Sequence, residues 1–305
     1  MMSAIKITGL EKSYGQLRAV DGLDLEIREK EVFGILGPNG AGKTTTMEMV
    51  ETLRQPDAGE ILVLGHNTRD EPRRIKELLG VQLQTTVFFD NLSVAETIDL
   101  FSSFYSNALP RADLLAMVGL EDKAHARVDG LSGGQHKRLS IALALVNDPS
   151  IVFLDEPTTG LDPQARRRIW DIVDSLREQE KTVVITTHYI EEAEQLCDRV
   201  AIMDRGSVIA LGSPQELISN HTTESTITFL LDPPLEESLV ASIEGVTTTL
   251  RKNGEYTVTT ASPQSTLLGI FTTAYNNHST ADEITMRRAT LEDVFLKITG
   301  RRIRE

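Results

Sequence analysis

The chain has 305 residues, a formal net charge of −14, 40% hydrophobic residues and one cysteine. Its length fits one large domain or two of ordinary size, and its composition fits a globular protein. The negative charge disfavours a general nucleic-acid binder, whose affinity would rest on clustered Lys and Arg, and one cysteine excludes an intramolecular disulfide.

Membrane-crossing segments are not predicted. The longest unbroken apolar run covers only Ile141–Val146, whereas a membrane span needs roughly 18 or more residues. The first residues, MMSAIKITGLEKSYG, lack the apolar stretch of a signal peptide. We therefore expect the chain not to cross a membrane by itself, and we interpret Cys197 as an inert core thiol.

The N-terminal part alternates strand-like segments around one predicted helix. Residues 5–36 are typical of short strands, and the last of these, EVFGIL, has the apolar character of a buried strand in an α/β sheet. A helix is predicted from Lys43 to Leu53, and residues 59–85 return to strand-like patterns. A buried strand leading directly into a helix is the setting in which phosphate-binding loops occur.

The junction between that strand and that helix carries such a loop. Residues 37–44 read GPNGAGKT and fit the pattern G-x-x-x-x-G-K-[ST]. Glycines let backbone N–H groups curl around phosphate oxygens, and the helix N-terminus adds a positive dipole end. Lys43 can supply charge to the β- and γ-phosphates, and the Thr44 hydroxyl suits Mg²⁺. The predicted phosphate-binding residues are Gly37, Pro38, Asn39, Gly40, Ala41, Gly42, Lys43 and Thr44.

A second glycine-containing helix start lies in the middle of the chain, where the pattern from Ser93 to about Val146 is mostly helical. Residues 131–135 read LSGGQ. Ser132 can cap the following helix, and the two glycines expose N–H groups at its positive end. Taken alone the segment is a solvated glycine loop. Beside a phosphate loop it is a second donor cluster that can close over the γ-phosphate.

The next buried strand ends in two acids. Residues 151–154, IVFL, drive the strand into the core, and Asp155 emerges at its carboxyl end, where ligands bind in open α/β sheets. Asp155 can hold Mg²⁺ through water, and Glu156 can orient or polarise an attacking water. A salt-bridged acidic pair is the alternative, and the phosphate loop favours the catalytic interpretation.

The remaining residues predict two further parts. Up to Asn220 the pattern continues as an α/β domain, including a hairpin at Arg205–Gly206 and a helix whose basic run, residues 166–168, we interpret as a solvated face. Residues 221–305 then give the order βαββαβ and a final helix with Thr290 and Asp293 at cap spacing. We predict a small C-terminal α+β domain, for which a ferredoxin-like fold is one candidate.

Residues 37–44, 131–135 and 151–156 together resemble the ATP-binding subunit of ABC transporters, in that family's order and spacing. The LSGGQ segment is the family's defining signature, and the resemblance covers about residues 3–220. It implies a P-loop NTPase fold with a mixed sheet and a helical subdomain, here about residues 88–146. It also implies ATP hydrolysis with Mg²⁺ by two copies packed head to tail, and a homodimer is the simplest case.

The resemblance also assigns roles to residues around one nucleotide. Tyr14 lies where the family stacks an aromatic ring on adenine, although a core or surface role is the alternative, and Thr45 is expected at the α-phosphate. Gln84 resembles the glutamine that touches Mg²⁺ and water, with Gln82 as a rival. Lys43 remains the expected contact for the β- and γ-phosphates.

Other assignments concern catalysis and the subunit boundary. The catalytic residues implied are Lys43, Gln84, Glu156 and His188, the last where the family contacts the γ-phosphate. Asp162 matches the loop that crosses between subunits. The metal ligands implied are Thr44, Gln84 and Asp155. The residues expected to face the other subunit's nucleotide are Ser132, Gly133, Gly134 and Gln135.

The C-terminal segment narrows the expected role. Residues 290–300, TLEDVFLKITG, resemble the closing segment of daunorubicin-resistance-type and related polysaccharide or lipid export ATPases. This implies a subunit at the cytoplasmic face of the membrane that powers a separately encoded polytopic permease, with no nucleic-acid partner. Residues 84–96 are expected to dock the permease, although Phe88 and Phe89 have packing as an alternative role. DNA-repair, ribosome-acting and non-hydrolysing relatives of the family are the competing functions.

Overall fold

The computed structural model describes residues 2–84, 86–89, 91–221 and 224–300. The chain divides into two compact units, the first running to Pro214 and the second beginning at Gln215. The predicted boundary after residue 220 therefore falls inside helix α8 (Pro214–His221). Helix α8 belongs with the second unit because Lys297 of helix α11 (Leu291–Thr299) donates a hydrogen bond to the His221 carbonyl at 2.7 Å.

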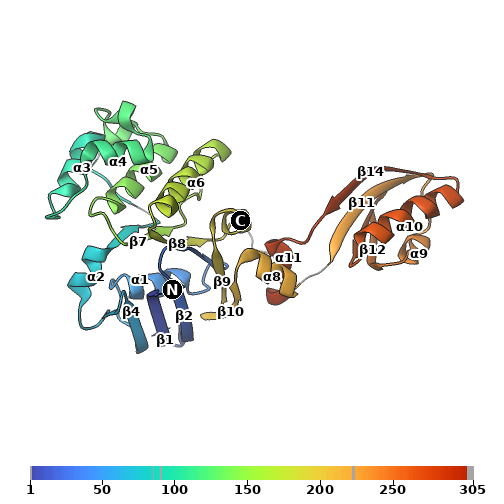
Figure 1. Cartoon of the computed structure of the whole chain (residues 1–305), viewed down its shortest axis with the longest axis horizontal. Helices are drawn as coiled ribbons and strands as arrows, with labels where there is room; N and C mark the ends of the chain where they lie inside the picture. The colour runs from blue at the N-terminus through green and yellow to red at the C-terminus, as the bar shows by residue number, and fades with distance from the viewer. Residues whose placement is uncertain (1, 85, 90, 222–223, 301–305) are drawn as a thin grey trace. The chain divides into compact units, whose positions relative to one another are not determined.

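Two sheets form the frame of the first unit (Figure 1). The larger sheet has the order β10-β9-β3-β8-β7-β6, with parallel pairing except between β9 and β10. Its strands are β3 (Val32–Leu36), β6 (Leu79–Gln82), β7 (Ile151–Asp155), β8 (Thr182–Thr187), β9 (Arg199–Asp204) and β10 (Ser207–Gly212). The smaller, antiparallel sheet has the order β2-β1-β4-β5 and contains β1 (Ser3–Tyr14), β2 (Leu17–Arg28), β4 (Ala58–Val63) and β5 (His66–Asn67).

Three details of the N-terminal prediction are wrong. Strands β1 and β2 are 12 residues long rather than short, because irregularities in their register let the pairing continue past positions where the alternation is lost. The strands predicted within residues 59–85 form as β4 and β6, but helix α2 (Pro72–Leu78) between them was missed, because it starts at a proline and buries only Ile75, so its apolar periodicity is weak. Helix α1 (Lys43–Val50) ends before Leu53 because Thr52 adopts a positive φ of 61°.

Helices occupy the stretch between β6 and β7, drawn at the upper left of Figure 1. They are α3 (Val94–Ser102), α4 (Arg111–Val118), the short 3₁₀ turns η1 (Glu121–Lys123) and η2 (Val128–Gly130), and α5 (Gly133–Ala144). A capping box opens α3, since the Glu96 N–H donates to Ser93 Oγ and the Ser93 N–H donates to Glu96 Oε2. Helices α6 (Pro163–Glu178) and α7 (Ile190–Leu196) precede β8 and β9.

The carboxyl ends of the parallel strands set the position of the site. Strands β3, β7 and β8 are almost completely buried, as the continuous apolar patterns of β3 and β7 predict. Because these three strands are parallel neighbours in the order β3-β8-β7, the segments that follow them meet at one edge of the sheet. Those segments are the phosphate loop, the acids at 155–156 and His188.

The second unit has a separate core. Its sheet has the order β12-β13-β11-β14, all antiparallel, and the chain order β11-α9-β12-β13-α10-β14 is that of a ferredoxin-like fold. Its elements are β11 (Ser225–Asp232), α9 (Glu237–Ala241), β12 (Val246–Lys252), β13 (Glu255–Thr260), α10 (Pro263–Asn276) and β14 (Thr280–Arg287). Val240 from α9 and Ile270 from α10 pack with Phe229 and Tyr256 of the sheet. Strands β12 and β13 form a hairpin that turns at Asn253–Gly254, with both residues at positive φ.

Within the described ranges, no helix is both long enough and apolar enough to cross a bilayer.

Candidate functional site

Close backbone packing explains the glycines at the two ends of the phosphate loop. A Cβ on Gly37 would lie 2.5 Å from the Met203 carbonyl oxygen. Gly42 has a φ of +99°, and a Cβ there would lie 2.4 Å from the Ala19 carbonyl oxygen. Larger residues would push the loop away from strands β2 and β9. The loop is therefore seated on the sheet by its glycines before helix α1 begins at Lys43.

The Lys43 ammonium lies inside this loop. Its Nζ donates to the Gly37 carbonyl at 2.6 Å and to the Pro38 carbonyl at 3.2 Å, and the residue is only 5% exposed. Burial lowers the pKa of Lys43, whereas the nearby Glu156 and Asp155 carboxylates oppose that shift. Next to it Thr44 is exposed and Thr45 is half-buried. The cation is thus held by its own loop, close to where phosphate oxygens would lie.

Asp155 and Glu156 are placed by strands β7 and β8. The Thr186 hydroxyl donates to Asp155 Oδ1, while the Glu156 N–H donates to the Thr186 carbonyl at 3.1 Å. Burial raises the pKa of Asp155, and the Thr186 hydrogen bond opposes the shift. Glu156 has a φ of 44°, an uncommon value for a non-glycine residue, so the chain turns sharply at this position.

The Glu156 carboxylate has three side-chain neighbours from separate segments. Gln84 Nε2 donates to Oε2 at 3.2 Å, and the Thr159 hydroxyl donates to the same oxygen at 3.3 Å. His188 Nδ1 lies 3.1 Å from Oε1. Glu156 is only 8% exposed. The structure therefore brings together Gln84, Glu156 and His188, which the sequence analysis proposed as catalytic.

A cavity of about 310 Å³ joins Gln84 and Glu156 to the phosphate loop. Gln84 lines it, whereas Gln82 is buried and donates to the neighbouring Leu83 carbonyl. The structure thus places Gln84 rather than Gln82 beside Glu156. The lining residues are Asn39, Gly40, Ala41, Gly42, Lys43, Thr44, Thr45, Gln84 and Glu156. Phosphate-loop N–H groups and one carboxylate share this space.

The LSGGQ segment does not line this cavity. Ser132 caps helix α5 and forms a reciprocal box with Gln135, whose Oε1 accepts the Ser132 N–H at 2.8 Å. Ser132 and Gly133 are exposed, and Gly134 lies against helix α6, since a Cβ there would be 2.9 Å from that of Ala165. The segment therefore presents a capped helix N-terminus to solvent instead of to its own chain's phosphate loop.

Two further predicted residues also lie outside the cavity lining. Asp162 is exposed and caps α6, accepting from the Gln164 and Ala165 N–H groups at 2.9 Å each. Tyr14, at the end of β1, is 41% exposed and has the Arg54 guanidinium 5.3 Å from its ring centroid. The ring is thus available at the surface and already carries a cation–π contact.

Sequence reasoning missed three residues that shape the site. Thr186 and Thr159 hold the two acids, as described above. Lys137, in the first turns of α5, directs its Nζ to the Gln84 carbonyl at 3.4 Å, and the Asp155 and Glu156 carboxylates act on its pKa, which burial lowers. The hydroxyls gave no signal because Thr is common in strands and turns. Lys137 gave no signal because the function predicted for LSGGQ depends on backbone donors.

Comparison with known proteins agrees with this geometry. A family profile described as "ABC transporter" matches residues 20–159. The Nod factor export ATP-binding protein I of Ralstonia nicotianae is 39% identical, over 99% of this chain and 95% of that protein. The chain belongs to the ABC transporter ATP-binding family. The daunorubicin resistance ATP-binding protein DrrA3 of Streptomyces coeruleorubidus is 38% identical, over 99% of this chain and 98% of its own length.

Solved ABC cassettes share the fold. The ATP-binding cassette MJ0796, solved as a dimer in a post-hydrolysis state with ADP and Pi, superposes with a TM-score of 0.63 at 30% identity, covering 68% of this chain and 98% of the cassette. The cbiO1 protein of Clostridium perfringens, part of the ABC transporter complex cbiONQ, gives a TM-score of 0.66 at 29% identity over 72% of this chain and 92% of that one. The predicted ABC-type fold is confirmed, and the chain is an ABC-type ATPase subunit homologous to ATP-binding proteins of export systems.

Proposed function

We propose that this ATPase subunit powers a separately encoded membrane permease that exports a drug, lipid or polysaccharide. The observation that carries the catalytic part is the placement of Glu156 between Gln84 and His188 at a cavity lined by the phosphate loop. The export part rests on relatives named for Nod factor export and daunorubicin resistance, which match nearly the whole chain.

In this proposal each residue acts on the water or on the phosphates. Glu156 orients and polarises the attacking water, because its buried carboxylate is the acceptor at the cavity wall. When ATP binds, Lys43 Nζ leaves the Gly37 and Pro38 carbonyls and donates to the β- and γ-phosphate oxygens. His188 contacts the γ-phosphate from the end of β8. Thr45 reaches the α-phosphate, and Tyr14 stacks on adenine.

The residues at the cavity fit a Mg²⁺ ion. Thr44 and Asp155 both line a small cavity at the end of β7, and Thr44 and Gln84 both line the larger one. Hydroxyl, carboxylate and amide oxygens are the hard donors that this ion takes, usually with several waters kept. When bound, the ion would neutralise charge on the phosphate oxygens. The proposed metal-binding residues are Thr44, Gln84 and Asp155.

A second subunit completes the nucleotide site in this proposal. Ser132, Gly133, Gly134, Gln135 and Asp162 are outside the cavity of their own chain, and the two glycines lie at a helix N-terminus suited to an anion. A head-to-tail homodimer would bring each LSGGQ to the partner's phosphate loop. Closure of the two chains would exclude water and surround the γ-phosphate with donors.

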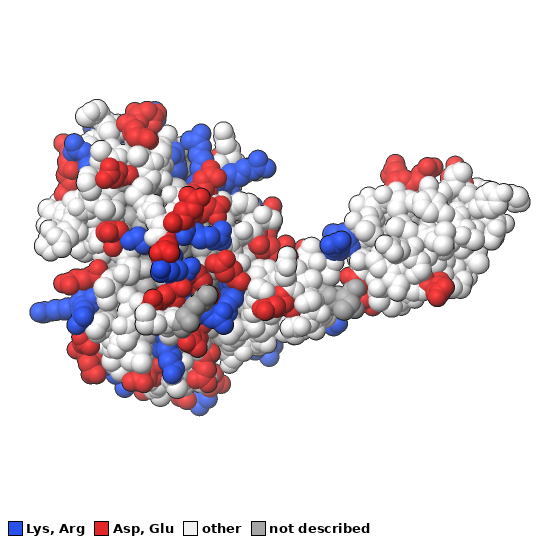
Figure 2. All heavy atoms as spheres, in the orientation of Figure 1, with Lys and Arg blue, Asp and Glu red and all other residues white. Residues whose placement is uncertain are grey.

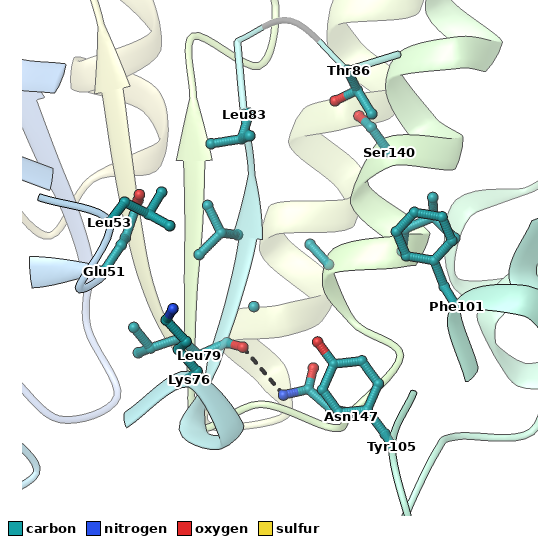
Figure 3. Close-up of a pocket in the computed structure, with 14 residues that line it drawn as sticks. Glu51, Leu53, Lys76, Leu79, Leu83, Thr86, Phe101, Tyr105, Ser140 and Asn147 are labelled. Atoms are coloured by element: carbon teal, nitrogen blue, oxygen red, sulfur yellow. Dashed lines mark hydrogen bonds between the residues drawn. The ribbon is translucent and has the colours of Figure 1, made fainter. Parts of the chain in front are cut away.

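A groove of about 360 Å³ between β6 and the helices suits the permease (Figure 3). Leu53, Leu79 and Leu83 lie opposite Phe101 and Tyr105 across it. Such an apolar groove fits the apolar face of a short helix. Neither Phe88 nor Phe89 lines the groove; Phe89 is 62% exposed, whereas the Phe88 ring lies 5.5 Å from that of His136, so packing accounts for Phe88 only. Docking there would hold the subunit at the cytoplasmic face of the membrane.

The surface charge favours a protein partner over a nucleic acid. On the face shown in Figure 2, Lys and Arg are interspersed with Asp and Glu over the first unit, and the whole chain carries a net charge of −14. A nucleic-acid binder would concentrate basic residues on one face. We therefore propose no nucleic-acid partner.

Capture from membranes of the native host tests the proposal. Tagged Glu156→Gln protein with ATP, in which the closed pair should persist, is the bait, and Lys43→Ala is the matched control for nucleotide-independent capture. We expect a polytopic membrane protein to be enriched with the first bait over the second. Recovery of ribosomes or DNA-processing proteins without a membrane protein would contradict the transport assignment and favour a non-transport ATPase.

A further inference from the structure

Glu192 is a fully buried acid that the catalytic proposal does not use. It lies on helix α7, immediately after the segment that carries His188, and is 0% exposed. Burial raises the pKa of Glu192, and the neighbours acting against that shift are Thr187, Thr158, Trp170 and Arg166. Burying a carboxylate whose charge is only partly compensated by its neighbours costs folding free energy, so packing alone does not explain an acid at this position.

The neighbours of Glu192 come from three segments that bear the proposed catalytic groups. Thr158 lies in the loop between Glu156 and Asp162. Thr187 ends strand β8 and directly precedes His188. Trp170 and Arg166 belong to helix α6, which Asp162 caps. One carboxylate therefore sits where the Glu156 loop, the His188 strand and the helix behind Asp162 meet.

The polar atoms in this cluster are close together but poorly paired. Both Glu192 oxygens, Thr158 Oγ1, Trp170 Nε1 and Arg166 Nε are buried without a partner in hydrogen-bond geometry. These five are half of the ten such side-chain atoms found in the described residues. Buried donors and acceptors are normally paired, and the Thr187, Thr158 and Trp170 side chains already act on this carboxylate as hydrogen-bond donors that lower its pKa, so a closer approach of their segments would complete the pairing.

Arg166 also corrects an expectation about the basic run at 166–168. Arg167 and Arg168 are exposed, as a solvated face requires. Arg166 instead stacks on the Tyr189 ring, with its guanidinium carbon 4.7 Å from the centroid, and lies 3.8 Å from Glu191. Arg166 is thus held against Tyr189, which follows His188 in the chain, and close to Glu191.

We propose that Glu192 is a positioning residue for ATP hydrolysis. Its carboxylate collects the Thr158 and Thr187 hydroxyls and the Trp170 indole N–H as the site closes, and so fixes the Glu156 loop relative to His188. This inference rests on the proposed roles of Glu156 and His188. It assigns to Glu192 no contact with ATP or water, and its effect reaches the reaction only through the segments that it joins.

A glutamine at this position separates positioning from packing. Glutamine keeps the size of Glu192 and removes the buried charge, so a purely structural role predicts equal or higher stability with unchanged turnover. A positioning role instead predicts a loss of turnover. Glutamine has one acceptor oxygen and a donor NH₂ group, so it cannot accept hydrogen bonds from all three donors as the two carboxylate oxygens can. We expect Glu192→Gln to lower kcat at least about tenfold while KM for ATP stays within about twofold.

The experiment measures kcat, KM and thermal unfolding on full-length protein for Glu192→Gln, Trp170→Phe and the double variant. Glu178→Gln, an exposed acid-to-amide change on α6, is the matched control and should be unchanged. If Glu192 acts through Trp170, the double variant should lose little more kcat than the Glu192 variant alone. Unchanged kcat in folded Glu192→Gln protein, or losses that multiply, would overturn the inference.

Two further variants keep the test decisive. If Glu192→Gln fails to fold, Thr158→Val and Trp170→Phe test the same contacts by removing the donors, and full turnover by both variants would refute the proposal. Failure of the underlying function looks different. In that case Glu156→Gln would turn over ATP like the wild type, whereas failure of the present inference leaves Glu156 essential and Glu192 dispensable.

Discussion

Glu156 illustrates how one side chain depends on several segments. Its acidity and its place after a buried strand are readable in the sequence, but its partners Gln84 and His188 are 72 and 32 residues away along the chain. Only the parallel order β8-β7-β6 brings the segments that bear them to one edge of the sheet. The role proposed for this residue therefore depends on the sheet as well as on the acid.

Replacement of Glu156 by Gln should abolish turnover and spare ATP binding. The amide keeps the shape but cannot polarise the attacking water, so we expect kcat to fall at least about 100-fold, in the range usual for removal of a general base. Phosphate release and binding of a fluorescent ATP analogue measure the two properties. Glu178→Gln is the control, and undiminished turnover of the Glu156 variant would remove Glu156 from the mechanism.

Glu51 offers a residue-scale test by pH. Burial, helped by the charges of Asp155 and Glu48, raises its pKa from 4.5 to about 8. The folded chain then holds a proton that the unfolded chain releases, so this group lowers stability as the pH rises from 4.5 through about 8. In nucleotide-free protein with chelator, Glu51→Gln should be more stable above pH 8, by on the order of 1–3 kcal/mol, and nearly unchanged at pH 5.

Urea unfolding of wild type and Glu51→Gln at the two pH values measures this difference. The exposed substitution Glu178→Gln controls for the loss of one negative charge. A Glu51 variant whose advantage is the same at both pH values would show that Glu51 is ionised in the folded chain throughout this range.

At the scale of elements, helix α5 has an observed role and a proposed role at the same end. Its N-terminus is closed by the Ser132–Gln135 box, and the same turn is exposed for a partner. Capping of the helix explains why Ser and Gln occupy positions 132 and 135. It does not explain the glycine at the exposed position 133. Capping and nucleotide contact can be separated because they respond differently to charge.

Ser132→Asp tests this separation. Asp is as good an N-cap as Ser, so the free energy of unfolding should change by less than about 0.5 kcal/mol. Its negative charge would face the partner's γ-phosphate, so ATP-dependent dimerisation of the Glu156→Gln protein should be lost. Light scattering with ATP measures it, and Ser132→Asn supplies the same cap without the charge. Equal dimerisation of the Asp and Asn variants would place the γ-phosphate elsewhere.

At the scale of the whole molecule, the groove in Figure 3 is separate from the catalytic cavity. Both lie near the segment that follows β6, since Leu83 lines the groove and Gln84 lines the cavity. Adjacent residues thus face the proposed permease site and Glu156. If the two proposed roles hold, a permease helix bound in the groove would contact the residue next to Gln84.

Leu53→Asp should break permease capture and leave basal ATPase intact. Leu53 is 56% exposed, so the fold tolerates the change, but a charge in an apolar groove opposes helix docking. Membrane pull-down and phosphate release measure the two effects. Leu17→Asp, at a similarly exposed leucine outside the groove, is the control. Undiminished capture by the Leu53 variant would move the docking surface away from this groove.

The sequence by itself determined the phosphate loop, the acids at 155–156, LSGGQ and the βαββαβ order of the second unit, because these depend on neighbouring residues and local periodicity. The tertiary structure decided what depends on distant pairing: Gln84 rather than Gln82 at Glu156, the support from Thr186 and Lys137, and the buried cluster at Glu192. Helix α8 joined the second unit for the same reason, since its partner α11 lies about 70 residues further on. Local patterns fix which groups a segment carries, whereas sheet order fixes which groups meet.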